Sequence, residues 1–272
     1  MWEALLSITG SLLFACQSAP ATGELYFKDD AGHVHQLTVT EPSQGASDAT
    51  WIGDRILAVV DRGFRNNLEL RDLSTPPNEV GRRLGGGASP AVSRAGTLAY
   101  ARSGERKGKF ADLIVVRRGN HRRVVGSGYL IQQLSWLSRH RLLAAIEARS
   151  GRVTLVDVTG PHRGRTVPIR GRPVSIPAIS ARRRVAYAFG RHGARRVAVM
   201  RLDGSHRRVF RRDWIPQAWS PNGRRILVGH RSRVGLMNPR TRAVQRLGRL
   251  PCGYFTSAAW TRPGEHVWPP PR

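Results

Sequence analysis

One unit of about 42 residues recurs along the chain and limits what it can fold into. Its clearest copy is AWSPNGRRILVGH at residues 218–230, which combines a Trp-Ser pair, a Pro-Asn-Gly turn and a short apolar run. The serine slot of this unit returns at intervals of 40 to 45 residues, at Ser7, Ile52, Ser93, Ser138, Ser180, Ser220 and Thr261. Such a period indicates one supersecondary structure used many times, in which each copy needs neighbours to cover its apolar faces.

Each copy contains segments with the character of β-strands. The serine slot is followed by an apolar run, and then by a segment that alternates apolar and polar residues, as a half-buried strand does. These alternating segments end on Asp29, Asp72, Asp157 or Asn238, whose side chains favour tight turns, whereas Arg117 and Arg201 break the rule. One further strand is expected before the serine slot, and a short one after the alternating segment, where the chain leads to the next copy. Each period therefore holds four strands.

Four short strands per period, joined by Gly, Asn, Asp and Pro turns, predict an all-β fold of the β-propeller type. The pattern W-S-P-[ND]-G, an apolar run, a strand ending on Asp or Asn, and then R-x-L resembles the repeat of TolB-like β-propellers over about residues 5–265. The resemblance implies a periplasmic or cell-envelope propeller that docks partner proteins at the mouth of its central channel. Without a signal segment, the location expected for the chain is the cytoplasm.

We predict six four-stranded blades, with seven as the alternative, in one domain that spans residues 1–272. The expected repeats lie at about 5–45, 46–88, 89–131, 132–174, 175–214 and 215–256, with a partial copy at 257–268. Seven serine slots against six alternating segments leave one slot in surplus. Residues 1 to about 21 are either a targeting segment or the beginning of the first repeat, and we favour the repeat. In that case the C-terminal AAWTRPGEHVWPPPR is either a closing strand or a tail. A start site upstream of Met1 would add a further option for a signal segment.

The chain is strongly basic, with 45 Lys and Arg residues against 18 Asp and Glu and a formal net charge of +27. A surface this positive could attract polyanions such as nucleic acid. Only three of the 45 basic residues are lysines, however, and a GC-rich genome also produces an excess of arginine at solvent-exposed positions. We favour this second interpretation over a specific polyanion site. No run of 18 apolar residues predicts a membrane-spanning helix. Cys16 and Cys252 are expected to be two thiols, the alternative being a disulfide in an oxidising compartment.

Enzyme signatures are missing from the sequence. It contains no G-x-S-x-G elbow, Walker loop, H-E-x-x-H or C-x-x-C motif, so we predict no enzyme, no cofactor and no metal site. His33 and His35 have the spacing to face one side of a strand, but a third ligand is missing, and a solvated turn is expected there.

Propeller geometry predicts where a partner would bind. The loops from strand four of one blade to strand one of the next share a face with the loops from strand two to strand three, and we call this side the loop face. Its candidates from the loops between strands two and three are Arg62, Arg65, Arg106, Arg191 and Arg231. Its candidates from the loops between blades are Tyr129, Arg170, Arg172, Asp213, Trp214, Tyr254 and Phe255.

Arginine beside exposed aromatic residues is typical of protein interfaces, and also of surfaces that bind single-stranded nucleic acid. The opposite face is basic as well, through Arg94, Arg139, Arg182, Arg183, Arg184, Arg224 and Arg225, which we interpret as a general surface charge. We therefore expect a monomeric, non-enzymatic scaffold that binds a protein partner. The alternative is an adaptor for an anionic polymer, either nucleic acid or an acidic glycan.

Overall fold

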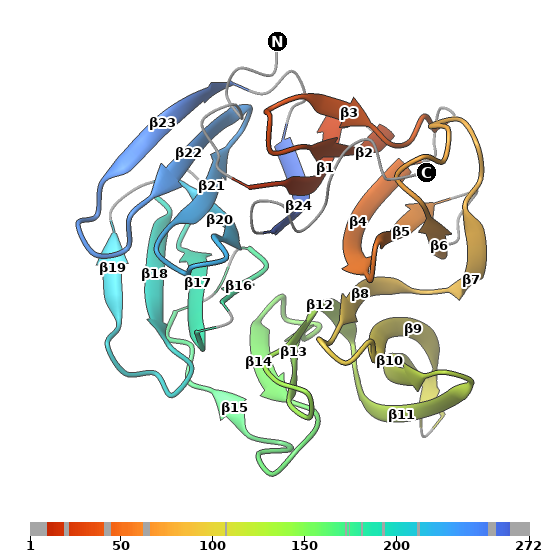
Figure 1. Cartoon of the computed structure of the whole chain (residues 1–272). Coiled ribbons are helices and arrows are strands. Elements are labelled where there is room, and N and C mark those ends of the chain that lie inside the picture. The colour runs from red at the N-terminus through yellow and green to blue at the C-terminus, as the bar shows by residue number, and fades with distance from the viewer. Residues whose placement is uncertain are drawn as a thin grey trace. The chain divides into compact units, whose positions relative to one another are not determined.

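A computed structural model describes residues 10–18, 22–40, 45–61, 66–106, 108–171, 173, 175–180, 182–191, 194–210, 213–249 and 254–261. Every regular element among them is a β-strand, and the strands form six four-stranded antiparallel sheets (Figure 1). The prediction of an all-β propeller with six four-stranded blades is confirmed.

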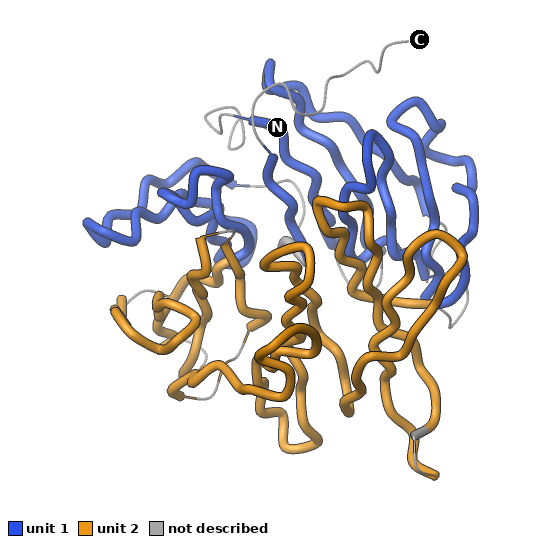
Figure 2. The backbone as a smooth tube through the Cα atoms, turned by 60° about the horizontal axis from the view of Figure 1, so that its bottom comes forward, with its two compact units in different colours: residues 1–86, 217–272 blue, residues 87–216 orange. Residues whose placement is uncertain are grey.

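The chain divides into two compact units, residues 1–86 with 217–272 and residues 87–216 (Figure 2). The first unit holds the sheets β24-β1-β2-β3 and β4-β5-β6-β7 and most of the sheet β20-β21-β22-β23. Its strands are β1 (Leu12–Ser18), β2 (Thr22–Lys28), β3 (Val34–Gln36), β4 (Gly45–Ile52), β5 (Arg55–Asp61), β6 (Asn66–Arg71), β7 (Arg82–Gly86), β20 (Ile215–Trp219), β21 (Ile226–His230), β22 (Arg233–Met237), β23 (Val244–Arg249) and β24 (Tyr254–Trp260).

The second unit holds the sheets β8-β9-β10-β11, β12-β13-β14-β15 and β16-β17-β18-β19. Its strands are β8 (Ala88–Val92), β9 (Leu98–Arg106), β10 (Lys109–Arg118), β11 (His121–Gly128), β12 (Leu130–Trp136), β13 (Leu142–Glu147), β14 (Val153–Asp157), β15 (Thr166–Val167), β16 (Ala178–Ile179), β17 (Arg184–Phe189), β18 (Arg196–Arg201) and β19 (Arg208–Phe210).

The apolar runs become strands that are buried on both faces. Alternate residues of β13 show this, because Leu142 and Ala144 pack in a cluster with residues of β8 to β12, whereas Leu143 and Ala145 pack in a cluster with residues of β17 and β18. Side chains of a strand point to opposite faces in turn, so a strand between two neighbouring sheets must be apolar at every position. This requirement explains why the second strand of each repeat is an uninterrupted apolar run.

The serine slot closes the hairpin between the first two strands of a blade. The Ser220 hydroxyl accepts a hydrogen bond from the Arg225 backbone N–H at 2.9 Å, and the Ser220 N–H donates to the Arg225 carbonyl at 2.9 Å. Ser93 and Ser180 make the same backbone bond in their own hairpins. The hydroxyl satisfies a backbone donor that a tight turn leaves unpaired, which explains why the slot favours serine.

The surplus slot is resolved by the pairing of strands from the two ends of the chain. β24 lies beside β1 in the sheet β24-β1-β2-β3, with Leu12 opposite Trp260 and Phe14 opposite Ala258. Thr261 then donates its N–H to the Ser11 carbonyl at 3.0 Å, which is the bond that the other slots make within a hairpin. Thr261 is therefore the slot of the first blade, residues 12–18 are a strand of that blade as we favoured, and Ser7 lies outside the described residues.

The expectation of two free thiols is wrong for Cys16, which is disulfide-bonded. The only other cysteine of the chain is Cys252, which lies outside the described residues and is the one possible partner within the chain. Cys16 belongs to β1 and sits at the register shift against β24. Residues that are distant in sequence become neighbours through this strand pairing, which sequence spacing alone cannot show.

Candidate functional site

Two kinds of loop meet on the predicted loop face of the second unit. Tyr129 lies between β11 and β12, and Arg149 lies between β13 and β14. The Arg149 guanidinium carbon lies 5.5 Å from the centre of the Tyr129 ring, a cation–π contact, and the Tyr129 residue is 48% exposed. An exposed ring held by a charged neighbour is a suitable anchor for a partner, because its shape is fixed before binding.

A second contact joins the same kinds of loop further along this unit. Arg195, before β18, lies 4.0 Å from Asp213, before β20, and both side chains are largely buried. Arg191, in the loop of Arg195, and Arg170, between β15 and β16, are exposed. The Arg170 carbonyl accepts a hydrogen bond from the Tyr187 hydroxyl at 2.9 Å, which fixes the backbone from which its side chain extends.

Trp214 does not fit the expectation of an exposed aromatic anchor, because it is only 8% exposed. The indole of a tryptophan carries a large apolar area, and its removal from water stabilises the fold rather than an interface. A partner could contact Trp214 only over a small area. Tyr129 is therefore the one aromatic candidate with an exposed side chain among the described residues.

The remaining candidates fall into three groups. Arg62, Arg65 and Arg172 lie outside the described residues. Arg106 lies in β9, and Tyr254 and Phe255 lie in β24, but the description does not extend to their side chains. Arg231 is exposed in the turn between β21 and β22, with a positive φ of 50°.

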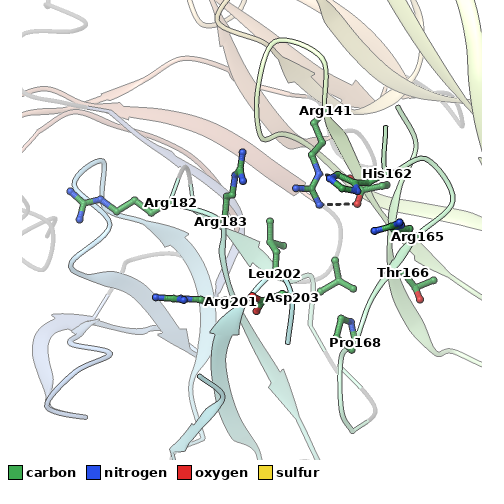
Figure 3. Close-up of a pocket in the computed structure, with 12 residues that line it drawn as sticks. Arg141, His162, Arg165, Thr166, Pro168, Arg182, Arg183, Arg201, Leu202 and Asp203 are labelled. Atoms are coloured by element: carbon green, nitrogen blue, oxygen red, sulfur yellow. Dashed lines mark hydrogen bonds and ion pairs between the residues drawn. The ribbon is translucent and has the colours of Figure 1, made fainter. Parts of the chain in front are cut away.

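The opposite ends of the strands in the second unit surround a cavity of about 590 Å³ (Figure 3). It is lined by Arg141, Asp157, His162, Arg165, Thr166, Val167, Pro168, Arg182, Arg183, Arg201, Leu202 and Asp203. These residues come from the sheets β12-β13-β14-β15 and β16-β17-β18-β19 and from their turns. We call this space the arginine cavity; Val167 and Leu202 are buried in its wall, whereas Arg165, Arg182, Arg183 and Arg201 are exposed.

One arginine of this cavity is neutralised within the fold. Arg141 donates from Nε to Asp157 Oδ1 at 2.7 Å and from a terminal nitrogen to Oδ2 at 2.9 Å, a bidentate pair. The hydrogen bond to Asp157 raises the pKa of Arg141. Asp203 is the other acid in the lining. A hydrogen bond from the Ser205 side chain, followed by the Ser205 N–H that it accepts at 2.8 Å, lowers the pKa of Asp203.

A second cavity of about 510 Å³ lies on the same side, between the sheets β8-β9-β10-β11 and β12-β13-β14-β15. Its lining includes the basic residues Arg118, Arg122, Arg123 and Arg139, with Trp136. Trp136 donates its indole N–H to the Ala91 carbonyl at 3.2 Å, so it serves blade packing. Our sequence interpretation treated the arginines of this side as general surface charge and did not find either cavity.

The histidine pair does not gather a set of metal ligands. His33 Nδ1 and His35 Nε2 each lie 3.2 Å from Asp29 Oδ2, and His33 is largely exposed. Within the described ranges, no three His, Cys, Asp or Glu side chains are placed to hold a metal ion. A search of the same residues finds no helix with the length and apolar character that crossing a membrane requires.

The sheets, the hairpin turns and the two sets of loops define this chain as a six-bladed β-propeller. Among solved structures it is similar to TolB from Acinetobacter baumannii, with a TM-score of 0.71 and 16% identity over 92% of this chain and 66% of that one. It therefore spans just under two thirds of the length of that TolB chain. The putative TolB from Agrobacterium tumefaciens matches with a TM-score of 0.59, 16% identity and coverage of 92% and 93%.

A chain of a nidogen–laminin complex is also similar, with a TM-score of 0.65, 13% identity and coverage of 92% of this chain and 97% of that one. No model of a known protein family and no curated protein matches the sequence. At these identities, the likeness to solved structures establishes the fold.

Proposed function

We propose that this protein is a non-enzymatic β-propeller scaffold that binds a protein partner through the loop face. The contact of Arg149 with the exposed Tyr129 ring carries the proposal, because it presents a preorganised aromatic and a guanidinium together. Aromatic residues and arginine are enriched among the residues that dominate interface energies. Structural neighbours that are named as complexes, such as the nidogen–laminin complex, show that propellers of this kind occur in protein assemblies.

We infer that the protein acts in an oxidising compartment, such as the periplasm or the cell envelope. The disulfide at Cys16 supports this location, because structural disulfides persist outside the reducing cytosol. The likeness to TolB structures is in agreement with it. We also propose that the protein is a monomer, which light scattering tests against the chain mass of 30.1 kDa.

The binding test compares two variants of the full chain as baits in a cell-envelope extract. The loop-face variant is Tyr129→Ser with Arg170→Ala and Arg191→Ala. The control is Arg94→Ala with Arg224→Ala and Arg240→Ala, which removes three positive charges, one more than the loop-face variant, from turns at the opposite ends of the strands. We expect one protein of the extract to bind to the wild type and to the control, and to be absent from the material bound by the loop-face variant.

Equal retention by all three baits would show that the loop face does not bind that protein. Loss from both variants in proportion to the charge removed would favour the second candidate function, an adaptor for an anionic polymer. The net charge of +27 favours that candidate, and retention on single-stranded DNA or heparin at about 150 mM salt tests it directly. Nonspecific attraction would disappear at that salt concentration.

A further inference from the structure

The hairpin of β9 and β10 is longer than the rest of the sheet to which it belongs (Figure 1). β8 pairs with β9 no further than Ala101, and β11 pairs with β10 no further than Asp112. The pairing of β9 with β10 continues beyond both, to the ends of the two strands. Residues 102–106 and 109–111 therefore form a two-stranded ribbon, and no other described strand pairs with either of its edges.

The β9 edge of this ribbon has backbone groups directed away from β10. The Thr97 carbonyl accepts the Ser93 N–H at 2.9 Å, so the backbone groups of Thr97 face β8. Every second residue of an antiparallel strand directs its N–H and C=O to the same side, and Ser103 and Glu105 belong to this series. β8 no longer pairs beyond Ala101, and nothing else in the described ranges takes its place. The edge therefore offers an N–H and a C=O from each of these two residues to a further strand.

Exposed apolar residues lie beside the ribbon. Phe110 is 67% exposed, and it lies on the same face of β10 as Asp112, two residues further along. The Asp112 carboxylate accepts the Ile131 N–H at 3.0 Å, so the chain that leads from β11 to β12 crosses this face next to the ribbon. Tyr129 and Leu130 belong to that stretch, and they are 48% and 41% exposed. Single exposed apolar residues are normal on a protein surface, whereas a group of them often marks an interaction site.

The ribbon contributes little to the stability of the fold. A two-stranded hairpin without further strands is marginally stable in water, and an exposed phenyl ring gains little from burial. Open strand edges also promote unwanted pairing, so natural proteins usually shorten or cover them. An extension of the hairpin that keeps both an open edge and an exposed Phe110 therefore indicates a binding surface.

We propose that an extended segment of an acidic partner protein adds as a strand to the β9 edge of the ribbon, opposite Ser103 and Glu105. The inference rests on the proposed function, because the ribbon is one of the loops of the loop face, and it specifies how the partner binds. In this mode of recognition, main-chain hydrogen bonds provide affinity and alternate side chains provide specificity. Phe110 and Leu130 contact the apolar side chains of the segment. The net charge of +27 favours an acidic partner and disfavours a second copy of this chain.

The probe is a phage-displayed library of random peptides, selected on the immobilised full chain at about 150 mM NaCl, where diffuse attraction is screened. The selected peptides are then titrated into the wild type, Glu105→Pro and Glu105→Gln. Proline removes the outward N–H of residue 105 and no bond between β9 and β10, and edge strands tolerate it there. Glutamine removes the charge of the exposed Glu105 and keeps the N–H.

We expect Glu105→Pro to bind the selected peptides about tenfold more weakly than the wild type, because one main-chain hydrogen bond is lost. Glu105→Gln is the matched control and is expected to bind at least as tightly as the wild type. Methylation of alternate backbone nitrogens of a peptide should abolish binding in one register and preserve it in the other, because a strand donates to a given neighbour only at every second residue.

Hydrogen exchange of the wild type gives a readout that does not depend on a variant. A bound peptide is expected to slow exchange of the Ser103 and Glu105 amides, and to leave that of Asn120 unchanged, since Asn120 lies in the exposed turn between β10 and β11. Unchanged exchange at Ser103 and Glu105, equal affinity for Glu105→Pro and the wild type, or a library that yields no peptide bound at this edge would overturn the proposal. A dimer that light scattering detects in the wild type and not in Glu105→Pro would assign the edge to a second copy and overturn it as well.

The failure of this inference can be told apart from the failure of the proposed function. Glu105→Pro serves as a further bait in the cell-envelope extract. A protein that Glu105→Pro retains and the loop-face variant loses would keep the loop face as the binding site and remove only the strand addition. A protein that both variants retain would count against the loop face itself.

Discussion

Asp48 makes the stability of the fold depend on pH. This residue lies in β4 at a register shift, where its carboxylate accepts the Ala49 N–H at 2.8 Å and bonds the Ser257 side chain of β24. Burial nevertheless dominates and raises the pKa of Asp48 to about 7, from an ordinary value of 3.8. The folded chain therefore holds a proton that the unfolded chain releases at neutral pH.

The sign of the effect follows from this raised pKa. The stabilisation that the bound proton provides is complete below about pH 3.8 and is lost as the pH rises through about 7. At 1.36 kcal/mol for each pKa unit, the whole change is about 4 kcal/mol, of which about 2.5 kcal/mol falls between pH 5 and pH 8. Ser257 belongs to β24, which pairs with β1. The proton on Asp48 therefore stabilises the region in which the two ends of the chain meet.

The test measures the free energy of unfolding in urea for the wild type and Asp48→Asn at pH 5 and pH 8. We expect the free-energy difference between variant and wild type to shift by about 2.5 kcal/mol in favour of the variant on going from pH 5 to pH 8. Asp54→Asn is the control, because it removes the same charge from the exposed turn between β4 and β5. A difference that is the same at both pH values, or that the control reproduces, would refute the reasoning.

Three further predictions concern stability. Reduction of the disulfide at Cys16, or Cys16→Ser, is expected to lower the free energy of unfolding by roughly 2 to 5 kcal/mol, which is the usual cost of removing a native disulfide. Urea titration with and without reductant measures it, and unchanged midpoints would contradict it. Asp157→Asn removes the charged partner of the Arg141 pair and is expected to cost about 2 kcal/mol by the same assay, while an unaffected midpoint would mean that solvent replaces the partner fully. Ser220→Ala removes the hydroxyl that accepts the Arg225 N–H and is expected to cost about 1 kcal/mol, with Ser220→Thr as the variant that keeps most of it.

The local structure was predictable because it is written in short-range patterns. The apolar runs, the alternating strands and the serine hairpins each depend on a few neighbouring residues, and 42-residue repetition reinforces a signal that is weak in any single copy. The exceptions were visible too, since Arg201 breaks the rule for the end of the third strand. The arginine cavity was not visible in the sequence, because a cavity forms only when the turns of two sheets are set beside each other.

The sequence by itself determined the repeat, the strands and the six-bladed class, since these follow from side-chain periodicity and turn chemistry. The tertiary structure decided which strand completes the first blade, because the bond from Thr261 to Ser11 spans 250 residues and no local pattern encodes it. It also decided that Cys16 is oxidised and that Trp214 is buried. Burial, charge pairing and disulfide contact depend on residues that only folding brings together, and for that reason they had to be observed in space.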